Sequence, residues 1–323
     1  MKLNFKNFNS YLKNNFIFEK RPSIALGLSG GPDSMALLFL LLEWKKKVNC
    51  NIIALIVNHN LRHEFKNEIL PILKFLNKKK INYKILSVRK SSVIKKSMNE
   101  ARLNRYNLLT NFCKKNNILH LFVAHHKEDN LETFVYRKLA GSDLNGLSAI
   151  NNISLINKTV ILRPLLNFSK KSIINYNKRN NIIYLDDPSN LDLKYARPTI
   201  RNFLNETNKK ELLNIENEYL YLNKYSKLYK LMISQILIKV IHHIKRNEVK
   251  LNLEYFLNYN VLILIKITEK IYQFLNNKNK HLRSKKIELF IKNAKDNNFK
   301  QFYLRDMLIK KVNDSLVFSK KAS

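Results

Sequence analysis

A short glycine-rich turn is the part of this sequence whose residue types point most directly to chemistry. It follows an apolar stretch at residues 24–28 and precedes a second apolar stretch, which we expect to form a helix beginning near Met35. Such a turn aims backbone N–H groups and the positive end of a helix at one point, which suits a bound phosphate. The residues of this predicted phosphate loop are Ser29, Gly30, Gly31, Pro32, Asp33 and Ser34.

The charge on this loop limits the classes of nucleotide-binding protein to which the chain can belong. The phosphate loop of kinases and GTPases carries a lysine that reaches the terminal phosphates, and residues 29–34 contain none. They offer Asp33 instead, an oxygen ligand suited to Mg²⁺, between two hydroxyl side chains. This argues against an ordinary kinase or GTPase, while a turn that binds nothing remains the alternative.

Two carboxylates follow a later apolar stretch, residues 119–124, and form a second candidate site. Asp129 and Glu132 are three positions apart, so on a helix they share a face. Paired carboxylates near a phosphate loop can hold Mg²⁺ or an amine. The preceding His125 and His126 are expected to cap that helix rather than to bind a metal.

Three further segments place polar residues after predicted strands or on the helices that follow them. His59 follows the second strand, Arg102 and Arg105 lie on one helix, and a turn at residues 186–190 precedes a further pair of arginines, Arg197 and Arg201. Each segment alone could be a turn or a solvated helix face. Their order along successive strands favours one shared site, because ligands in parallel sheets bind at the carboxyl ends of strands.

The pattern of apolar residues predicts an α/β fold for the first part of the chain. Strands with few polar positions that alternate with helices indicate a parallel sheet with helices on both faces. We predict strands at 24–28, 52–57, 83–88, 119–124 and 160–162, with helices near 34–46, 66–79 and 99–115.

The pattern becomes mostly helical after about residue 198. Helical spacing runs through residues 199–246, 252–276 and 285–294, and the tail alternates as a β-hairpin that turns near Asn313. We therefore predict two domains, a nucleotide-binding domain at 1–198 and a smaller, mostly helical region at 199–323, for which the excess of lysine and arginine in the chain favours RNA binding.

Composition favours a nucleic-acid partner inside the cell. The chain has 59 lysine and arginine residues against 24 aspartate and glutamate residues, a net charge of +35, which attracts polyanions. An AT-rich genome would account for part of that excess.

The chain has two cysteines, Cys50 and Cys113, which are too far apart in sequence to form a zinc ribbon. A polar N-terminus and the lack of a long apolar run predict a cytoplasmic protein without a membrane partner.

The ordered motifs resemble the tRNA(Ile)-lysidine synthetases, a family of N-type ATP pyrophosphatases. Besides the loop at 29–34, the matching segments are VNHNLR at 57–62, ARLNRY at 101–106, HHKEDNLET at 125–133 and DPSN at 187–190, which together cover roughly residues 20–201. The resemblance implies an adenine nucleotide alpha hydrolase-like fold. It also implies ATP-dependent ligation of lysine to the wobble cytidine of the CAU-anticodon isoleucine tRNA, through an adenylated tRNA, with release of AMP and diphosphate.

The resemblance also assigns roles to individual residues and partners. ATP, Mg²⁺, L-lysine and the isoleucine tRNA would be bound, and a homodimer is compatible with the sequence. In that assignment the loop at 29–34 and His59 bind ATP, and Asp33 and Asp129 hold Mg²⁺. Arg102 and Arg105 would stabilise the α-phosphate or the tRNA backbone, and Arg197 and Arg201 would bind tRNA. Glu132, together with Glu128, would orient the lysine amine and accept its proton.

Several positions depart from the family pattern. Asn58 stands where the family usually has Asp, Glu128 and Asn130 replace Asp and Gln, and Pro198 removes a backbone donor where Asn is usual.

Three alternative functions are compatible with the same loop. A tRNA thiolase would need paired cysteines, and an amidotransferase-linked synthetase would need a glutaminase partner. A basic RNA-binding module that keeps the fold without turnover is the non-enzymatic alternative, and tRNA-dependent consumption of ATP separates it from an enzyme.

Overall fold

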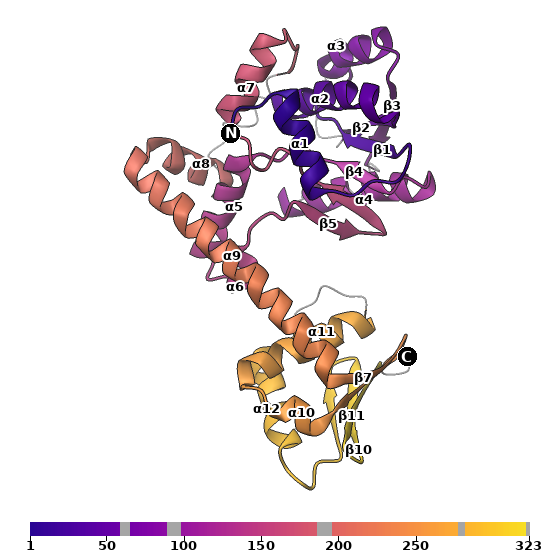
Figure 1. Cartoon of the computed structure of the whole chain (residues 1–323), viewed down its shortest axis with the longest axis vertical. Helices are drawn as coiled ribbons and strands as arrows, with labels where there is room; N and C mark the ends of the chain where they lie inside the picture. The colour runs from indigo at the N-terminus through magenta and orange to yellow at the C-terminus, as the bar shows by residue number, and fades with distance from the viewer. Residues whose placement is uncertain (59–64, 89–97, 186–195, 277–281, 321–323) are drawn as a thin grey trace. The chain divides into compact units, whose positions relative to one another are not determined.

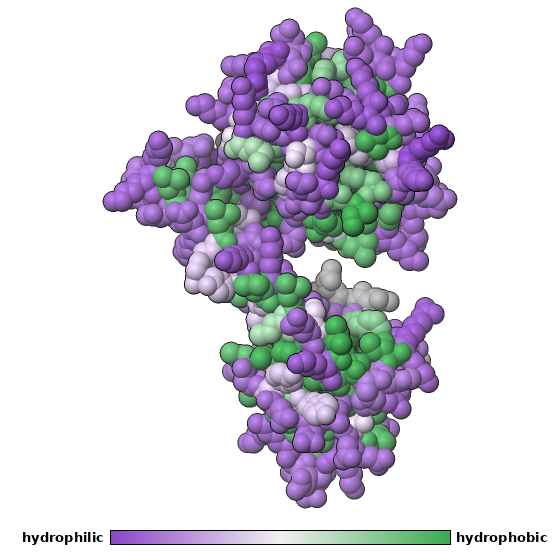
Figure 2. Space-filling view, in the orientation of Figure 1, coloured by the Kyte–Doolittle hydropathy of each residue, from purple (hydrophilic) through white to green (hydrophobic). Residues whose placement is uncertain are grey.

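A computed structural model of the chain describes residues 1–58, 65–88, 98–185, 196–276 and 282–320. The chain divides into two compact units, Met1–Asn223 and Lys224–Ser323. Figure 1 shows both units, coloured from the N-terminus to the C-terminus. Hydrophilic side chains cover most of the face of each unit that is visible in Figure 2, as expected for a chain with this net charge.

The first unit is built on a sheet that has six strands in its described part, in the order β3-β2-β1-β4-β6-β5. Neighbouring strands are parallel except for β5 and β6. The predicted parallel sheet is confirmed, whereas the antiparallel edge strand β5 was not predicted. The strands are β1 (Ser23–Gly27), β2 (Asn51–Asn58), β3 (Asn82–Ser87), β4 (His120–Phe122), β5 (Ile153–Ile156) and β6 (Thr159–Leu162).

Helices cover both faces of this sheet, as predicted. Alternate residues of β1 pack into separate clusters, because Ile24 and Leu26 join one buried cluster and Ala25 joins the other. The helices of the unit are α1 (Phe5–Asn15), α2 (Pro32–Val48), α3 (Phe65–Lys78), α4 (Met98–Lys115), α5 (Lys127–Leu139), α6 (Leu144–Leu147), α7 (Lys170–Arg179), α8 (Ala196–Glu206) and the start of α9 (Lys209–Val240).

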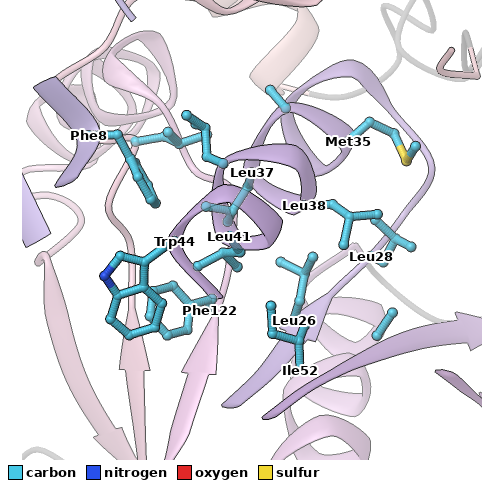
Figure 3. Close-up of a cluster of buried hydrophobic side chains, with 14 of the residues drawn as sticks. Phe8, Leu26, Leu28, Met35, Leu37, Leu38, Leu41, Trp44, Ile52 and Phe122 are labelled. Atoms are coloured by element: carbon cyan, nitrogen blue, oxygen red, sulfur yellow. The ribbon is translucent and has the colours of Figure 1, made fainter. Parts of the chain in front are cut away.

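Helix α2 is buried on nearly every side, which explains its unbroken apolar sequence. Figure 3 shows Leu38 beside Leu28, which directly follows the end of β1, and Trp44 beside Phe122 of β4. The residues of α2 that have no exposed surface are Met35, Ala36, Leu37, Leu38, Leu40 and Leu41. A helix packed in this way holds its N-terminus, and therefore the loop before it, in a fixed position relative to the sheet.

The strand order brings two loops of the first unit together. The chain proceeds from β1 outward to β2 and β3, then returns to place β4 on the other side of β1. The loops that leave β1 and β4 therefore lie at adjacent carboxyl ends, at the point where the order reverses. Ligands bind at this switch point in open α/β sheets.

The first unit extends further along the chain than the boundary predicted near residue 198. Ile200 and Leu204 of α8 are buried against Leu131 of α5, and Leu212 and Tyr219 of α9 pack on the same cluster. These contacts tie α8 and the start of α9 to the sheet domain, so the division falls within α9, after Asn223.

The second unit combines the end of α9 with further helices and an antiparallel sheet. The predicted C-terminal hairpin is confirmed as β10 and β11, and it belongs to a sheet of order β7-β8-β11-β10-β9. The helix predicted to continue to residue 246 is wrong at its end, because α9 stops at Val240 and β7 follows. The remaining elements are β7 (Ile241–Lys245), β8 (Glu248–Asn252), α10 (Leu253–Leu257), α11 (Val261–Asn276), α12 (Ser284–Ala294), β9 (Gln301–Leu304), β10 (Met307–Val312) and β11 (Ser315–Lys320).

The core of the second unit is apolar and rich in aromatic side chains, centred on Phe290, whose ring lies 6.0 Å from that of Phe318. Across the part of the chain that the structure describes, no helix has the length and apolar character needed to cross a membrane.

Candidate active site

The turn between β1 and α2 folds back sharply at a position where only glycine fits easily. Gly30 has a φ of +84°, and a Cβ atom placed on it would lie 2.8 Å from Cδ1 of Leu185. The backbone N–H of Leu185 donates to the Gly30 carbonyl at 2.9 Å. The turn is therefore held closed from a segment far away in the sequence.

Two serines fix the shape of the loop around the start of α2. The Ser34 hydroxyl donates to the Gly31 carbonyl at 3.0 Å, and its oxygen lies 3.1 Å from the Ser29 hydroxyl. Helix α2 begins at Pro32, and its N-cap residue Gly31 provides no side-chain hydrogen bond. The positive end of the helix can therefore receive an anion.

Asp33 lies in the first turn of α2 and is paired with a lysine that was not among the site residues predicted from the sequence. Nζ of Lys170 donates to both carboxylate oxygens of Asp33 at 2.7 Å. Lys170 opens α7, whose N-cap is Ser169. The phosphate loop thus has a basic neighbour, although the loop itself has no lysine.

His126 caps α5, as expected, and brings acidic side chains together around its ring. The backbone N–H of His126 donates to Oδ2 of Asp129 at 3.0 Å, which closes the first turn of the helix. Its Nε2 atom lies 3.6 Å from Asp129 and 4.0 Å from Asp33. The segments that follow β1 and β4 therefore each place a carboxylate near the same imidazole nitrogen.

The ionisation of His126 and Glu128 follows from this arrangement. Burial alone would lower the pKa of His126, but its hydrogen bond with Glu128 and the charges of Asp129 and Asp33 raise that pKa above its ordinary value. Burial would raise the pKa of Glu128, but bonds from His126 and from the backbone N–H of Lys170 hold it below its ordinary value. When it is protonated, the imidazole of His126 offsets the repulsion between the carboxylates around it.

The carboxylates near His126 are suited to a metal cation that is also coordinated by phosphate oxygens. In the described segments, no group of three or more His, Cys, Asp and Glu side chains is arranged to hold a metal ion. Asp33 and Asp129 are two carboxylates on facing loops, and Mg²⁺ is bound in nucleotide sites by one or two carboxylates together with phosphate oxygens. The two residues can therefore serve Mg²⁺ with a nucleotide in place.

Glu132 lies one turn after Asp129 but has a different environment. Its side chain is 3% exposed, and Arg201 donates to both of its oxygens, at 2.6 Å from Nε and 3.1 Å from a terminal nitrogen. The hydrogen bond and charge of Glu132 raise the pKa of Arg201. The sequence predicted separate roles for Glu132 and Arg201, whereas the structure joins them as a bidentate ion pair.

Four arginines, which we call the arginine cluster, lie close enough to His125 for their charges to act on it. A terminal nitrogen of Arg102 lies 3.4 Å from Nε2 of His125. Burial and the charges of the four arginines hold the pKa of His125 well below its ordinary value, so the ring is neutral. The members of the cluster are Arg102, Arg105, Arg163 and Arg197.

The members of the arginine cluster repel one another. Desolvation lowers the pKa of Arg105 and, although its side chain is exposed, that of Arg197, and the charge of Arg102 lowers both further. The charge of Asp129 acts in the opposite direction on both. Guanidinium groups held together in this way leave a concentration of positive charge that a polyanion would relieve.

Most of the residues singled out from the sequence lie at this end of the sheet, and two others were missed. Loop residues 29–34 with Asp129 form one part of it, and Arg102, Arg105 and Arg197 form another. His59 and residues 186–195 lie outside the described residues. No pattern in the sequence pointed to Lys170. Arg163 directly follows β6, so it could have been found by searching for polar residues that come directly after predicted strands.

The cysteines do not belong to the site. Cys50 and Cys113 are both buried and free, and each packs into an apolar cluster on a different face of the sheet. Burial raises the pKa of the Cys113 thiol to about 12, which suppresses the reactive thiolate. The thiol chemistry of a thiolase therefore has no support in this part of the molecule.

Comparison with known proteins places the chain in a family. Residues 3–208 match the family model described as the PP-loop domain, ATP_bind_3. Among curated relatives, the tRNA(Ile)-lysidine synthase of Orientia tsutsugamushi is 36% identical over 62% of this chain and 45% of its own length. The enzyme of the same name from Wolbachia pipientis wMel is 41% identical over 59% of this chain and 44% of its own. The matched region thus spans less than half of these relatives.

A solved structure has the same fold. The U34-tRNA thiolase NcsA from Methanococcus maripaludis, with its [4Fe-4S] cluster, matches with a TM-score of 0.56 at 19% identity, over 68% of this chain and 78% of its own. At this level of identity the similarity shows the fold alone.

Proposed function

The chain belongs to the ATP-binding PP-loop domain family, and from this premise we propose that it is a ligase joining lysine to C2 of the wobble cytidine of a CAU-anticodon isoleucine tRNA. The observation that carries the proposal is the meeting of the loop at 29–34, the carboxylates around His126 and the arginine cluster at one end of the sheet. The names of the curated relatives supply the substrate.

The chemistry requires two steps in a fixed order. The C2 oxygen of cytosine is a poor leaving group, so it first attacks the α-phosphate of ATP and expels diphosphate. The amine of lysine then attacks C2, AMP leaves with the oxygen, and the amine loses a proton. Each step develops charge on phosphate oxygens, which preorganised cations stabilise.

The first step is assigned to the phosphate loop and the arginine cluster. The loop and the uncapped start of α2 would bind the β- and γ-phosphates, while Arg102 and Arg105 would face the α-phosphate. His59 is retained as an ATP contact from the family resemblance. Mg²⁺ held by Asp33 and Asp129 would neutralise charge on the departing diphosphate. Lys170 would shift from Asp33 to a phosphate oxygen when the nucleotide binds.

The second step is assigned to Glu132, with Glu128 in a supporting role. The low pKa of Glu128 makes it a poor proton acceptor and suits it to orienting the lysine ammonium. Glu132 can accept the proton only when Arg201 parts from it. Arg201 and Arg197 are proposed to contact tRNA phosphates, so bound tRNA would favour that separation.

The remaining partners follow from the same proposal. The second unit, with its apolar core and lysine-rich sequence, would hold the body of the tRNA. A cytoplasmic location and a homodimer remain predictions from the sequence.

The proposal is tested by incubating the full chain with labelled lysine, ATP and the CAU-anticodon isoleucine tRNA. We expect lysine to enter the tRNA with release of one AMP per lysine. The matched control is the same tRNA with uridine at the wobble position, which should accept none. Equal labelling of both tRNAs, or no labelling with wild-type protein that binds ATP, would contradict the proposal.

A further inference from the structure

A basic groove between α7 and the first residues of the chain has no part in the mechanism above. Its volume is about 570 Å³. None of its lining residues is acidic. They are Met1, Lys2, Ser169, Lys171, Ser172, Asn175, Lys178 and Arg179.

One cation of the groove is held in place by the backbone. The guanidinium of Arg179 donates through Nε to the carbonyl of Asn175 at 3.1 Å and through a terminal nitrogen to the carbonyl of Leu3 at 3.1 Å. Neither acceptor is a carboxylate, so the charge of Arg179 is not neutralised by these bonds. An arginine fixed in this way loses less conformational entropy when it binds an anion.

Two hydroxyl groups of the groove can also donate. The oxygen of Ser172 accepts the backbone N–H of Leu3 at 2.6 Å, and the oxygen of Ser169 accepts the backbone N–H of Ser172 at 3.3 Å. Because both oxygens act as acceptors in these bonds, their own protons can be donated to a ligand. Fixed cations and hydroxyl donors without acids are the groups that contact nucleic-acid backbones.

We propose that this groove binds consecutive phosphates of the tRNA sugar–phosphate backbone. The cations are spread out rather than gathered at one point, since Lys171 and Arg179 are eight residues apart, about 12 Å along the helix. That span exceeds a single small anion and suits a chain of phosphates. The identity of the polyanion rests on the proposed function, because tRNA is the RNA that the site would modify.

The groove shares its helix with the active site. Lys170, next to Lys171, bonds Asp33 of the phosphate loop, and the side-chain amide of Asn177 donates to the Pro32 carbonyl at 2.9 Å. RNA bound in the groove would therefore lie against the helix that supports the loop. It would add affinity without touching the reacting atoms.

The test is the double variant Lys171→Gln with Lys178→Gln, compared with Lys114→Gln with Lys115→Gln. The control removes the same charge from exposed residues at the C-terminal end of α4, which does not line the groove. Affinity of the full chain for the CAU-anticodon tRNA is measured between low and moderate salt, with turnover at saturating tRNA and the melting temperature as further readouts.

We expect the groove variant to flatten the dependence of log K on log salt by about 0.7–0.9 for each phosphate that the groove no longer neutralises. Its KM for tRNA should rise about tenfold with kcat within twofold of wild type, and the control should match wild type. Equal slopes in both variants, or binding that polyglutamate displaces as well as tRNA does, would overturn the groove proposal. If the wild type forms no lysidine, the proposed function fails, while the change in slope still decides the groove.

Discussion

The two compact units bury different kinds of side chains. In the first unit, the ionisable side chains of His126 and Glu132 are nearly inaccessible, with 7% and 3% of their surface exposed. The second unit has a core of apolar groups such as Phe290 and Phe318, and its buried Glu269 is paired within its own helix. Glu132 is paired with Arg201, which is 69 positions away, so a buried charge of the first unit is balanced by a contact between distant segments, as is typical of a functional site. The second unit has the character of a packed scaffold.

The largest expected effect is on the chemistry of the first unit. We expect Asp33→Ala to lower the rate of AMP transfer to tRNA by about 10²–10³-fold, because charge on the departing diphosphate is no longer offset. Stability should change little, since the Asp33–Lys170 pair is partly exposed. Single-turnover transfer from α-labelled ATP measures the rate, with the exposed Asp296→Ala as control. A wild-type rate would remove Asp33 from the site.

The second prediction concerns the stability of the scaffold. Phe290 has no exposed surface, so Phe290→Ala should destabilise the second unit by about 3–5 kcal/mol. Leu289→Ala, at a half-exposed neighbour, should cost much less. Denaturant unfolding followed together with ATP binding measures both units. If ATP binding is lost over the same denaturant range in which the second unit unfolds, the two units do not unfold independently.

The third prediction separates the two carboxylates of α5. Asp129→Asn should lose AMP transfer about a hundredfold, whereas Glu132→Gln should still adenylate tRNA and then stall before lysine attack. Adenylated tRNA should accumulate only in the second variant, as detected with α-labelled ATP. A block at the same step in both variants would show that the two residues act as one site.

The smallest expected effects distinguish the two arginines of α8. Arg201→Ala leaves the buried Glu132 carboxylate without its partner and should lower stability by about 1–3 kcal/mol. Arg197→Ala should keep the melting temperature and instead flatten the salt dependence of tRNA binding by about 0.7–0.9 in slope. Identical effects of the two variants would contradict their different environments.

Sequence patterns predicted the part of the fold that depends on local order. The strands and helices around residues 24–48 follow directly from apolar runs, and His126 could be predicted as a cap because it precedes a helix with an acid three positions later. Strand β5 was missed because it has only four residues and lies at an edge. The end of α9 was missed because the apolar residues of β7 continue its helical spacing.

The parts that could not be predicted depend on contacts between distant residues. Arg201 and Glu132 are 69 positions apart, so nothing in either segment reveals their pairing. The same is true of Lys170 and Asp33, which are 137 positions apart. The boundary predicted near residue 198 lies before the division after Asn223, because the burial of Leu204 against α5 is a tertiary contact that the local sequence does not show.

The central claim is that this site adenylates the tRNA before lysine takes part. The most direct measurement is incubation of the full chain with α-labelled ATP and the CAU-anticodon isoleucine tRNA, with lysine omitted. We predict that the label enters the tRNA and leaves it as AMP when unlabelled lysine is added. Label that appears on lysine, or on tRNA only when lysine is present from the start, would contradict this account.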